Sequence, residues 1–283
     1  MKMYLTNLLA LVLLSNAYGQ KIPEIGIATP IANDSIVYLA GYKYIGEGVA
    51  RMVSPRLSDA EFQENKRKVQ QARCKVYMCN VFFPSDIKIA GKDVDEAKVL
   101  SHAEGVFKRA NILGIEAIVL GSGNARKIEE DIDKDKAISK FIALAKKMAV
   151  LAQQNNVKIF LENLNSTETN FMTTLADAAK IVRKVNHPNF RLNADIYHML
   201  KESESPNSIL NAADVISYVE VAEKEGRTRP GVHNENFLPY FKVLKQINYK
   251  GKIFIEGRWT NLEEEASLAK SYLENQLKLA YAD

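Results

Sequence analysis

The chain has 283 residues, of which 47% are hydrophobic and 25% are charged, and its formal net charge is +4. This length and composition provide an ample core for one large domain or two small ones. Basic residues alternate with acids and form no stripe with interleaved aromatic residues, so the composition argues against nucleic acid as a partner. The sequence contains neither a low-complexity segment nor a repeat of fixed period.

The first nineteen residues have the features of a secretory signal. Lys2 supplies a positive charge, Leu8 to Leu14 form an apolar run, and Ala17-Tyr18-Gly19 places small residues where a signal peptidase cuts. We therefore expect a signal peptide at residues 1–19 and a secreted or periplasmic mature domain at residues 20–283. An uncleaved anchor is the alternative, although the run is short for a bilayer, and no other span is expected.

Cys74 and Cys79 are the only cysteines. Five residues apart on an extended strand, they would lie about 16 Å apart on opposite faces. They cannot pair with each other, so buried free thiols are expected and the fold does not depend on a disulfide.

Strand and helix patterns alternate along the mature chain. The sequence predicts strands at residues 24–28, 44–47, 74–83, 115–120, 157–161, 190–194, 215–221 and 252–255. The helical patterns cover residues 35–43, 58–72, 93–113, 135–154, 174–185, 209–213, 236–247 and 262–279. Ser58 and Glu61 form a capping box at the start of one of these helices, and Gly121-Ser122-Gly123 predicts a tight turn rather than a phosphate loop.

Eight strand–helix units in this length favour an α/β fold with a single (β/α)8 TIM barrel over a doubly wound sheet. In such a barrel the carboxyl ends of all strands converge at one mouth. Four of the predicted strands end in an acid: Glu162, Asp195, Glu220 and Glu256.

Four converging carboxylates would repel one another unless a cation joined them. Because every ligand atom would be oxygen, Mn²⁺ or Mg²⁺ is favoured over Zn²⁺ or Cu²⁺. The alternative is that each acid caps a helix or pairs with a nearby base. The candidate bases are Arg126, Arg191, Arg227 and Arg258.

The histidines divide into two groups. His198, three residues after Asp195, could bind substrate hydroxyls or a metal, or could be an ordinary loop residue. His233 could serve the same purposes, whereas His102 in a predicted helix and His187 before a proline are expected to be structural.

Several strand-end motifs together resemble a known family. They are Glu162-Asn-Leu-Asn165, Asp195-Ile-Tyr-His198-Met199, Val219-Glu220-Val-Ala-Glu223 followed by Arg227-Thr-Arg-Pro-Gly231, Gly251-Lys-Ile-Phe-Ile-Glu256, and Gly121-Ser-Gly-Asn-Ala-Arg126. The ordered set resembles the sugar phosphate isomerase/epimerase family with the xylose isomerase-like barrel, over nearly all of the mature chain.

Because the predicted signal peptide implies export, and phosphorylated sugars are scarce outside the cytoplasm, we expect an exported protein that acts on a non-phosphorylated sugar or polyol. The resemblance implies a sugar isomerase or epimerase that transfers a proton with the help of a divalent metal. It implies Glu162 and Glu256 as the catalytic acid and base. The implied metal ligands are Glu162, Asp195, Glu220 and Glu256. The implied substrate-binding residues are His198, Arg227, Asn163 and Glu223. The expected partner is a small sugar, and an oligomer is compatible with the sequence.

One departure from the family pattern affects this prediction. The strand-seven metal ligand of the family is a histidine, and this chain has Glu220 there. The alternative is therefore a non-catalytic carbohydrate-binding relative, or a lyase on oxidised glycosides, with an altered metal site. Apurinic endonucleases with three zinc ions share the barrel, but their sites need more histidines than the four present here.

Overall fold

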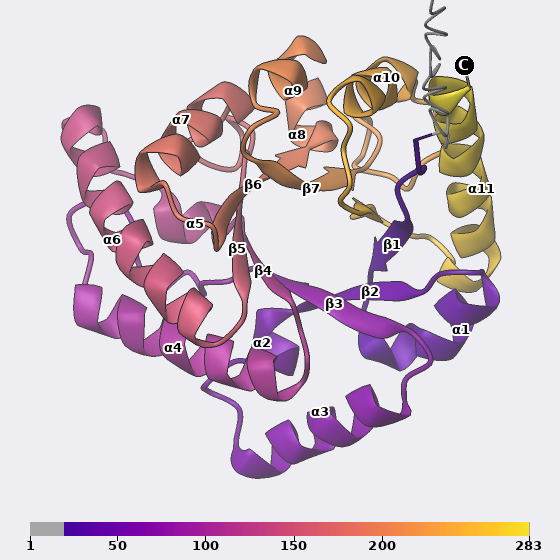
Figure 1. Cartoon of the computed structure of the whole chain (residues 1–283). Coiled ribbons are helices and arrows are strands. Elements are labelled where there is room, and N and C mark those ends of the chain that lie inside the picture. The colour runs from indigo at the N-terminus through magenta and orange to yellow at the C-terminus, as the bar shows by residue number, and fades with distance from the viewer. Residues whose placement is uncertain (1–19, 283) are drawn as a thin grey trace, which may run out of the picture.

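The computed structural model describes residues 20–282, and eight parallel strands form a closed barrel in chain order (Figure 1). The single (β/α)8 barrel predicted from the sequence is confirmed. The predicted signal peptide at residues 1–19 lies outside the described residues. The strands are β1 Ile25–Ala28, β2 Tyr44–Gly48, β3 Lys75–Asn80, β4 Ala117–Leu120, β5 Lys158–Glu162, β6 Phe190–Asp195, β7 Ile216–Val221 and β8 Ile253–Ile255.

Helices surround the barrel on the outside (Figure 1). The long ones are α3 Asp59–Gln71, α4 Glu96–Ile112, α6 Lys134–Gln154, α7 Leu175–Val185, α10 Leu238–Gln246 and α11 Leu262–Tyr281. The short ones are η1 Ile31–Asn33, α1 Asp34–Leu39, α2 Val49–Met52, α5 Gly123–Arg126, α8 Ile196–Lys201 and α9 Asn207–Asn211.

Most element boundaries agree with the sequence, and the differences have local causes. The capping box of Ser58 and Glu61 is present at the start of α3. Strand β3 ends at Asn80, before the predicted position 83, because Val81 has a left-handed φ of 55°. Helix α4 begins at Glu96 because Asp95 caps it through Lys98 N. The sequence pattern did not predict α2, α5 and α8, which are short and begin within three residues of the end of a strand.

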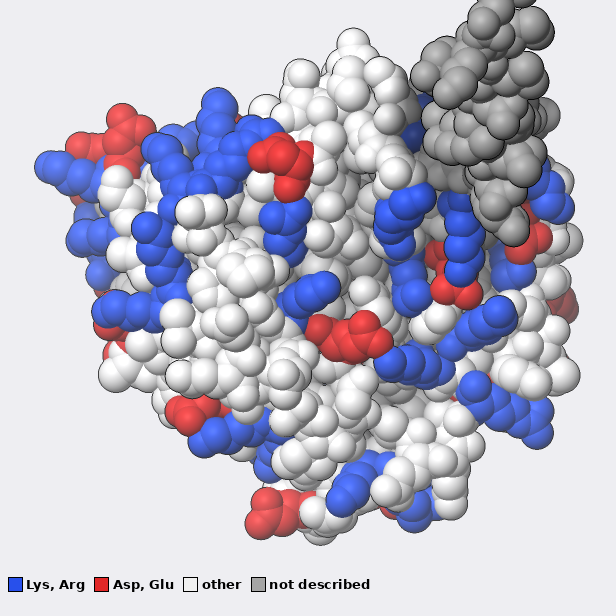
Figure 2. Space-filling view, in the orientation of Figure 1, with Lys and Arg blue, Asp and Glu red and all other residues white. Residues whose placement is uncertain are grey.

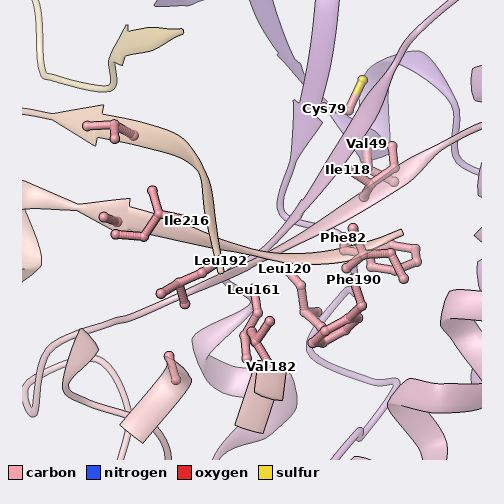
Figure 3. Close-up of a cluster of buried hydrophobic side chains, with 14 of the residues drawn as sticks. Val49, Cys79, Phe82, Ile118, Leu120, Leu161, Val182, Phe190, Leu192 and Ile216 are labelled. Atoms are coloured by element: carbon pink, nitrogen blue, oxygen red, sulfur yellow. The ribbon is translucent and has the colours of Figure 1, made fainter. Parts of the chain in front are cut away.

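Side chains that point outward from the strands form the main core with the helices. Leu161 of β5 and Leu192 of β6 lie in this core, and Leu161 points toward Val182 of α7 (Figure 3). Cys74 and Cys79 are buried and free, as the sequence predicted. Continuous apolar strands of this kind need cover on both faces, which the barrel and its helices provide.

Inward-pointing side chains form a second, separate apolar cluster, which we call the floor. Its buried members are Met78, Ala117, Val119, Phe160, Tyr218 and Phe254. The rings of Phe160 and Tyr218 stack with centroids 5.0 Å apart. Gly26 leaves room for the ring of Phe254, since a Cβ at that position would overlap it. The floor therefore fills the barrel interior beneath the strand ends.

The charged residues are mixed at the surface. Figure 2 shows Lys and Arg side chains on one face with acidic and uncharged side chains between them. Within residues 20–282, no helix is both long and apolar enough to cross a membrane.

Candidate metal and active site

Four carboxylates meet above the floor, as the barrel prediction required. Glu162, Asp195 and Glu220 are the inward residues at the carboxyl ends of β5, β6 and β7, and Glu256 directly follows β8. One oxygen from each of the four lies within 4.8 Å of the others. A second group within the same limit joins Glu162 and Asp195 with His198.

The position of these acids follows from the alternation of side chains along a strand. Residues i and i+2 point to the same face, so an acid two positions after a floor residue lies directly above the floor. Three of the acids, on β5, β7 and β8, follow the aromatic residues Phe160, Tyr218 and Phe254 in this way. The aromatic rings thus close the site from below and exclude water from its base.

The pairing of β6 with β7 brings two of the acids level. The register moves from Leu192–Ile216 to Asn193–Tyr218, so that Ser217 is skipped. Asp195 consequently pairs with Glu220. This irregularity is a β-bulge, which re-aims side chains next to functional sites.

The donor set fits a divalent cation. Asp195 Oδ2 and Glu220 Oε1 are buried, and neither has a hydrogen-bond partner among the described residues. A buried carboxylate oxygen without a partner is costly, and a cation would satisfy both atoms at once. All four carboxylates supply oxygen, the ligand atom that Mg²⁺ and Mn²⁺ prefer. Glu162, Asp195, Glu220 and Glu256 are therefore the residues that would hold the metal.

Burial and mutual repulsion change the acidity of two of these groups. Burial, together with the charges of Glu256, Glu162 and Asp195, raises the pKa of Glu220 well above its ordinary value. Burial also raises the pKa of Glu256 to about 7, although Arg227 opposes the rise. Protonation thus relieves part of the repulsion when no cation is present.

His198 is fully buried against the carboxylates. Its Nε2 lies 3.3 Å from Glu162 Oε1 and 3.5 Å from Asp195 Oδ2. The Asn165 Nδ2 group donates to His198 Nδ1 at 2.8 Å, so in the neutral ring the proton is on Nε2 and faces the acids. Burial lowers the pKa of His198, but the two carboxylates outweigh it and the net pKa is raised.

Arg227 pairs with one of the acids, as the alternative interpretation of the cluster predicted. Its guanidinium forms an ion pair with Glu256 and lies 3.8 Å from Asp195 Oδ2. It also lies 3.4 Å from Glu168 and stacks over the Tyr197 ring at 4.6 Å. Arg227 therefore lies beside the carboxylate cluster.

The other three candidate bases have different partners. Arg126 donates to the backbone oxygen of Glu162, whereas Arg191 bonds Ser217 Oγ and the backbone of Asp214. Arg258 pairs through its backbone with the Arg227 loop. None of these contacts is to a carboxylate oxygen of the cluster, although the buried Arg126 charge acts on Glu162 and Glu168.

Two residues predicted to bind substrate have structural partners instead. Asn163 is fully buried, donates to the Asp195 backbone oxygen at 3.1 Å, and accepts from Asp195 N at 3.0 Å. Glu223 accepts hydrogen bonds from Thr228 Oγ1 and from the backbone N–H groups of Gly231, His233 and Glu235. Asn163 thus ties β5 to β6 and Glu223 organises the loop after β7, and the binding of substrate by these two residues stays a prediction. The His233 side chain is exposed on that loop.

Three residues that contact or make room for the site were not predicted from the sequence. Asn80 donates to Glu256, but it was hidden inside a strand expected to continue to residue 83. Glu168 lies in a loop and pairs with Arg227, and no sequence pattern distinguishes it. Gly121 follows β4, and a Cβ there would overlap the Glu162 carboxylate, so the glycine leaves space for that group.

The sequence as a whole matches a known family. The profile of the xylose isomerase-like TIM barrel family matches residues 37–276. The chain belongs to this family.

Its curated relatives are sugar epimerases and isomerases. The chain is 36% identical to L-ribulose 3-epimerase of Methylomonas sp. over 117 residues, which cover 41% of each chain. It is 28% identical to ketose 3-epimerase of Arthrobacter globiformis over 151 residues, 46% of this chain and 52% of that one. The matches thus span about two fifths to one half of the length of these relatives.

Solved structures show the same fold over nearly the whole length. D-allulose 3-epimerase of Methylomonas sp., in complex with D-allulose, superposes with a TM-score of 0.78 and 22% identity, covering 91% of this chain and 98% of that one. The 3-keto-D-glucoside 4-epimerase of E. coli gives a TM-score of 0.76 at 17% identity, with 89% and 99% covered. At these identities the likeness establishes the fold.

Gly121→Ala should displace the Glu162 carboxylate and lower the affinity for Mn²⁺ by about tenfold or more, as changes around metal ligands do. Isothermal titration with Mn²⁺ measures this directly. Gly123→Ala is the matched control two residues away, because its Cβ would contact the Glu168 backbone and Leu164 instead. Equal losses in both variants would show that loop distortion, and not the position of Glu162, is responsible.

The raised pKa values predict how the stability of the metal-free protein depends on pH. The native state holds protons on Glu220 and Glu256 that the unfolded state releases, so stability falls as pH rises from 4.5, the ordinary value, to about 7. The loss should be on the order of 1 kcal/mol or more in denaturant titrations. Glu220→Gln should flatten this slope, and excess Mn²⁺ should reverse it. A stability that rises with pH without metal would contradict the assignment.

Proposed function

We propose that this protein is an exported sugar isomerase or epimerase that moves a proton on a non-phosphorylated sugar or polyol with a divalent cation. The observation that carries the proposal is the four-carboxylate cluster with two unpartnered buried oxygens, in a barrel of the xylose isomerase-like family. The ketose epimerase relatives support the choice of reaction.

Glu162 and Glu256 are the proton-transfer pair in this proposal. A cation held by the four carboxylates would polarise two neighbouring substrate oxygens and acidify the carbon-bound hydrogen. One glutamate removes that proton and the other returns a proton, either to the opposite face of the same carbon or to the neighbouring carbon. A pKa of about 7 for Glu256 suits a group that must both accept and donate near neutral pH.

Arg227 and His198 are placed to hold the substrate oxygens. The Arg227 guanidinium lies at the edge of the cluster, between Glu256 and Glu168. The Nε2–H of His198 faces Glu162 and Asp195. Both donors can stabilise negative charge that develops on an enediolate oxygen.

The charge of the site favours an uncharged substrate. Glu168 adds a fifth carboxylate beside the cluster, and Arg227 pairs with Glu168 and with Glu256. When ionised, these acids outnumber the charges of one guanidinium and one divalent cation together. A phosphate or carboxylate on the substrate would be repelled, because charges at short range interact strongly in a buried site.

Proton exchange with deuterated water tests this proposal on the full chain with Mn²⁺. We expect deuterium to enter free ketoses such as L-ribulose and D-allulose faster than hydroxypyruvate or a ketose phosphate. Glu162→Gln should slow the exchange by at least about 100-fold with an unchanged melting temperature in metal-free buffer.

Three outcomes would redirect the proposal. Binding of a sugar without deuterium uptake would support the carbohydrate-binding alternative. Elimination products from oxidised glycosides would support the lyase. Turnover of the phosphorylated sugar alone would overturn the choice of substrate class.

Export is a separate part of the proposal, and the sequence of residues 1–19 supports it. Expression with the native N-terminus should yield an extracytoplasmic protein whose first residue is Gln20, as intact mass would reveal. Leu11→Arg, which places a charge in the apolar run, should keep the chain uncleaved in the cytoplasm. An uncleaved wild-type chain in the membrane fraction would favour the anchor instead.

A further inference from the structure

Asn193 occupies a floor position where the neighbouring strands have aromatic residues. It lies two residues before Asp195 on β6, just as the aromatic residues on β5, β7 and β8 precede their acids. It pairs in register with Tyr218, a floor residue, and it is fully buried. An apolar side chain would suit this position better by burial alone.

The partner of Asn193 is Glu220. The Asn193 Nδ2 group donates to Glu220 Oε2. A carboxylate that binds a metal is ionised and can only accept hydrogen bonds, so this orientation of the amide, with its NH₂ group toward Glu220, suits the metal-bound state. Neither Asn193 Oδ1 nor Glu220 Oε1 has a hydrogen-bond partner among the described residues. The contact therefore occupies one oxygen of Glu220 and leaves the other, Oε1, without a hydrogen-bond partner.

We infer that Asn193 is a positioning residue that restricts Glu220 to binding the metal through Oε1 alone. The inference rests on the proposed function, because it concerns the same metal site. Glu220 replaces the histidine that the resemblance leads one to expect on strand seven, and glutamate differs from histidine in two ways. It adds a negative charge, and it has two equivalent oxygens on a more flexible stem. The amide of Asn193 offsets part of the charge and holds one of the oxygens.

One-oxygen binding has a consequence for metal preference. Ca²⁺ accepts two oxygens of one carboxylate and takes six to eight ligands, whereas Mg²⁺ requires near-ideal octahedral geometry. A glutamate that is free to present both oxygens would favour the larger ion. Asn193 therefore keeps the site selective for Mg²⁺ and Mn²⁺, and it leaves coordination positions open for two substrate oxygens.

A double-mutant cycle on the full chain tests the inference, with Mn²⁺, Mg²⁺ and Ca²⁺ affinities from isothermal titration. Asn193→Leu should weaken Mn²⁺ binding by about tenfold, in the range for residues that orient metal ligands. It should also raise the affinity for Ca²⁺ relative to Mg²⁺. In the Glu220→His background, the same Asn193→Leu change should alter Mn²⁺ affinity by less than about threefold, because no carboxylate remains to be held.

Each result either supports the inference or overturns it. Equal losses in both backgrounds, or an unchanged preference between Ca²⁺ and Mg²⁺, would show that Asn193 serves only the packing of the floor. Unchanged Mn²⁺ affinity in Asn193→Leu would also overturn it. If the metal-free melting temperature shows that Asn193→Leu is unfolded, Asn193→Ala removes the same donor without adding apolar volume, and the same criteria apply. A wild-type chain that binds none of the three ions would overturn the proposed metal function itself, which is a distinct result.

Discussion

The site depends on one constraint: four carboxylates are held close together above an apolar floor. Their charges repel one another, and burial makes ionisation still less favourable. The raised pKa values of Glu220 and Glu256 are the direct consequence. A cation removes the conflict, so the same arrangement that costs stability in the metal-free protein provides affinity for a metal.

The barrel makes this arrangement rigid. Phe160, Tyr218 and Phe254 fill the interior below the acids, and the backbone closes around them through eight parallel pairings. Residues on neighbouring strands then hold single carboxylate oxygens by hydrogen bonds. Asn193 donates to Glu220, and Asn80 donates to Glu256. Gly121 contributes by having no side chain, which leaves room for Glu162.

The segments after β6 and β7 add the positively polarised groups. Arg227 reaches Glu256 and Glu168, and the loop that carries it is organised by four hydrogen bonds to the buried Glu223. His198 turns its Nε2–H toward Glu162 and Asp195 because Asn165 occupies its other nitrogen. In the proposed function the acids supply the base and these donors stabilise a developing oxyanion.

The sequence by itself determined the barrel and the four acids, because both are local signals. Apolar runs of strand length alternate with helical patterns, and an acid at the end of such a run is visible in one stretch of chain. Strand β3 shows the limit of local patterns. It ends at Asn80 because Val81 is left-handed, and the contact of Asn80 with Glu256 was therefore not predicted. Only the tertiary structure decided which partner each polar group has. The fold gave Glu223 and Asn163 buried hydrogen-bond partners, and it brought Asn193, Gly121 and Glu168 close to the acids from segments distant in the chain. Such contacts depend on strand register, including the skipped Ser217, and no local pattern encodes that register.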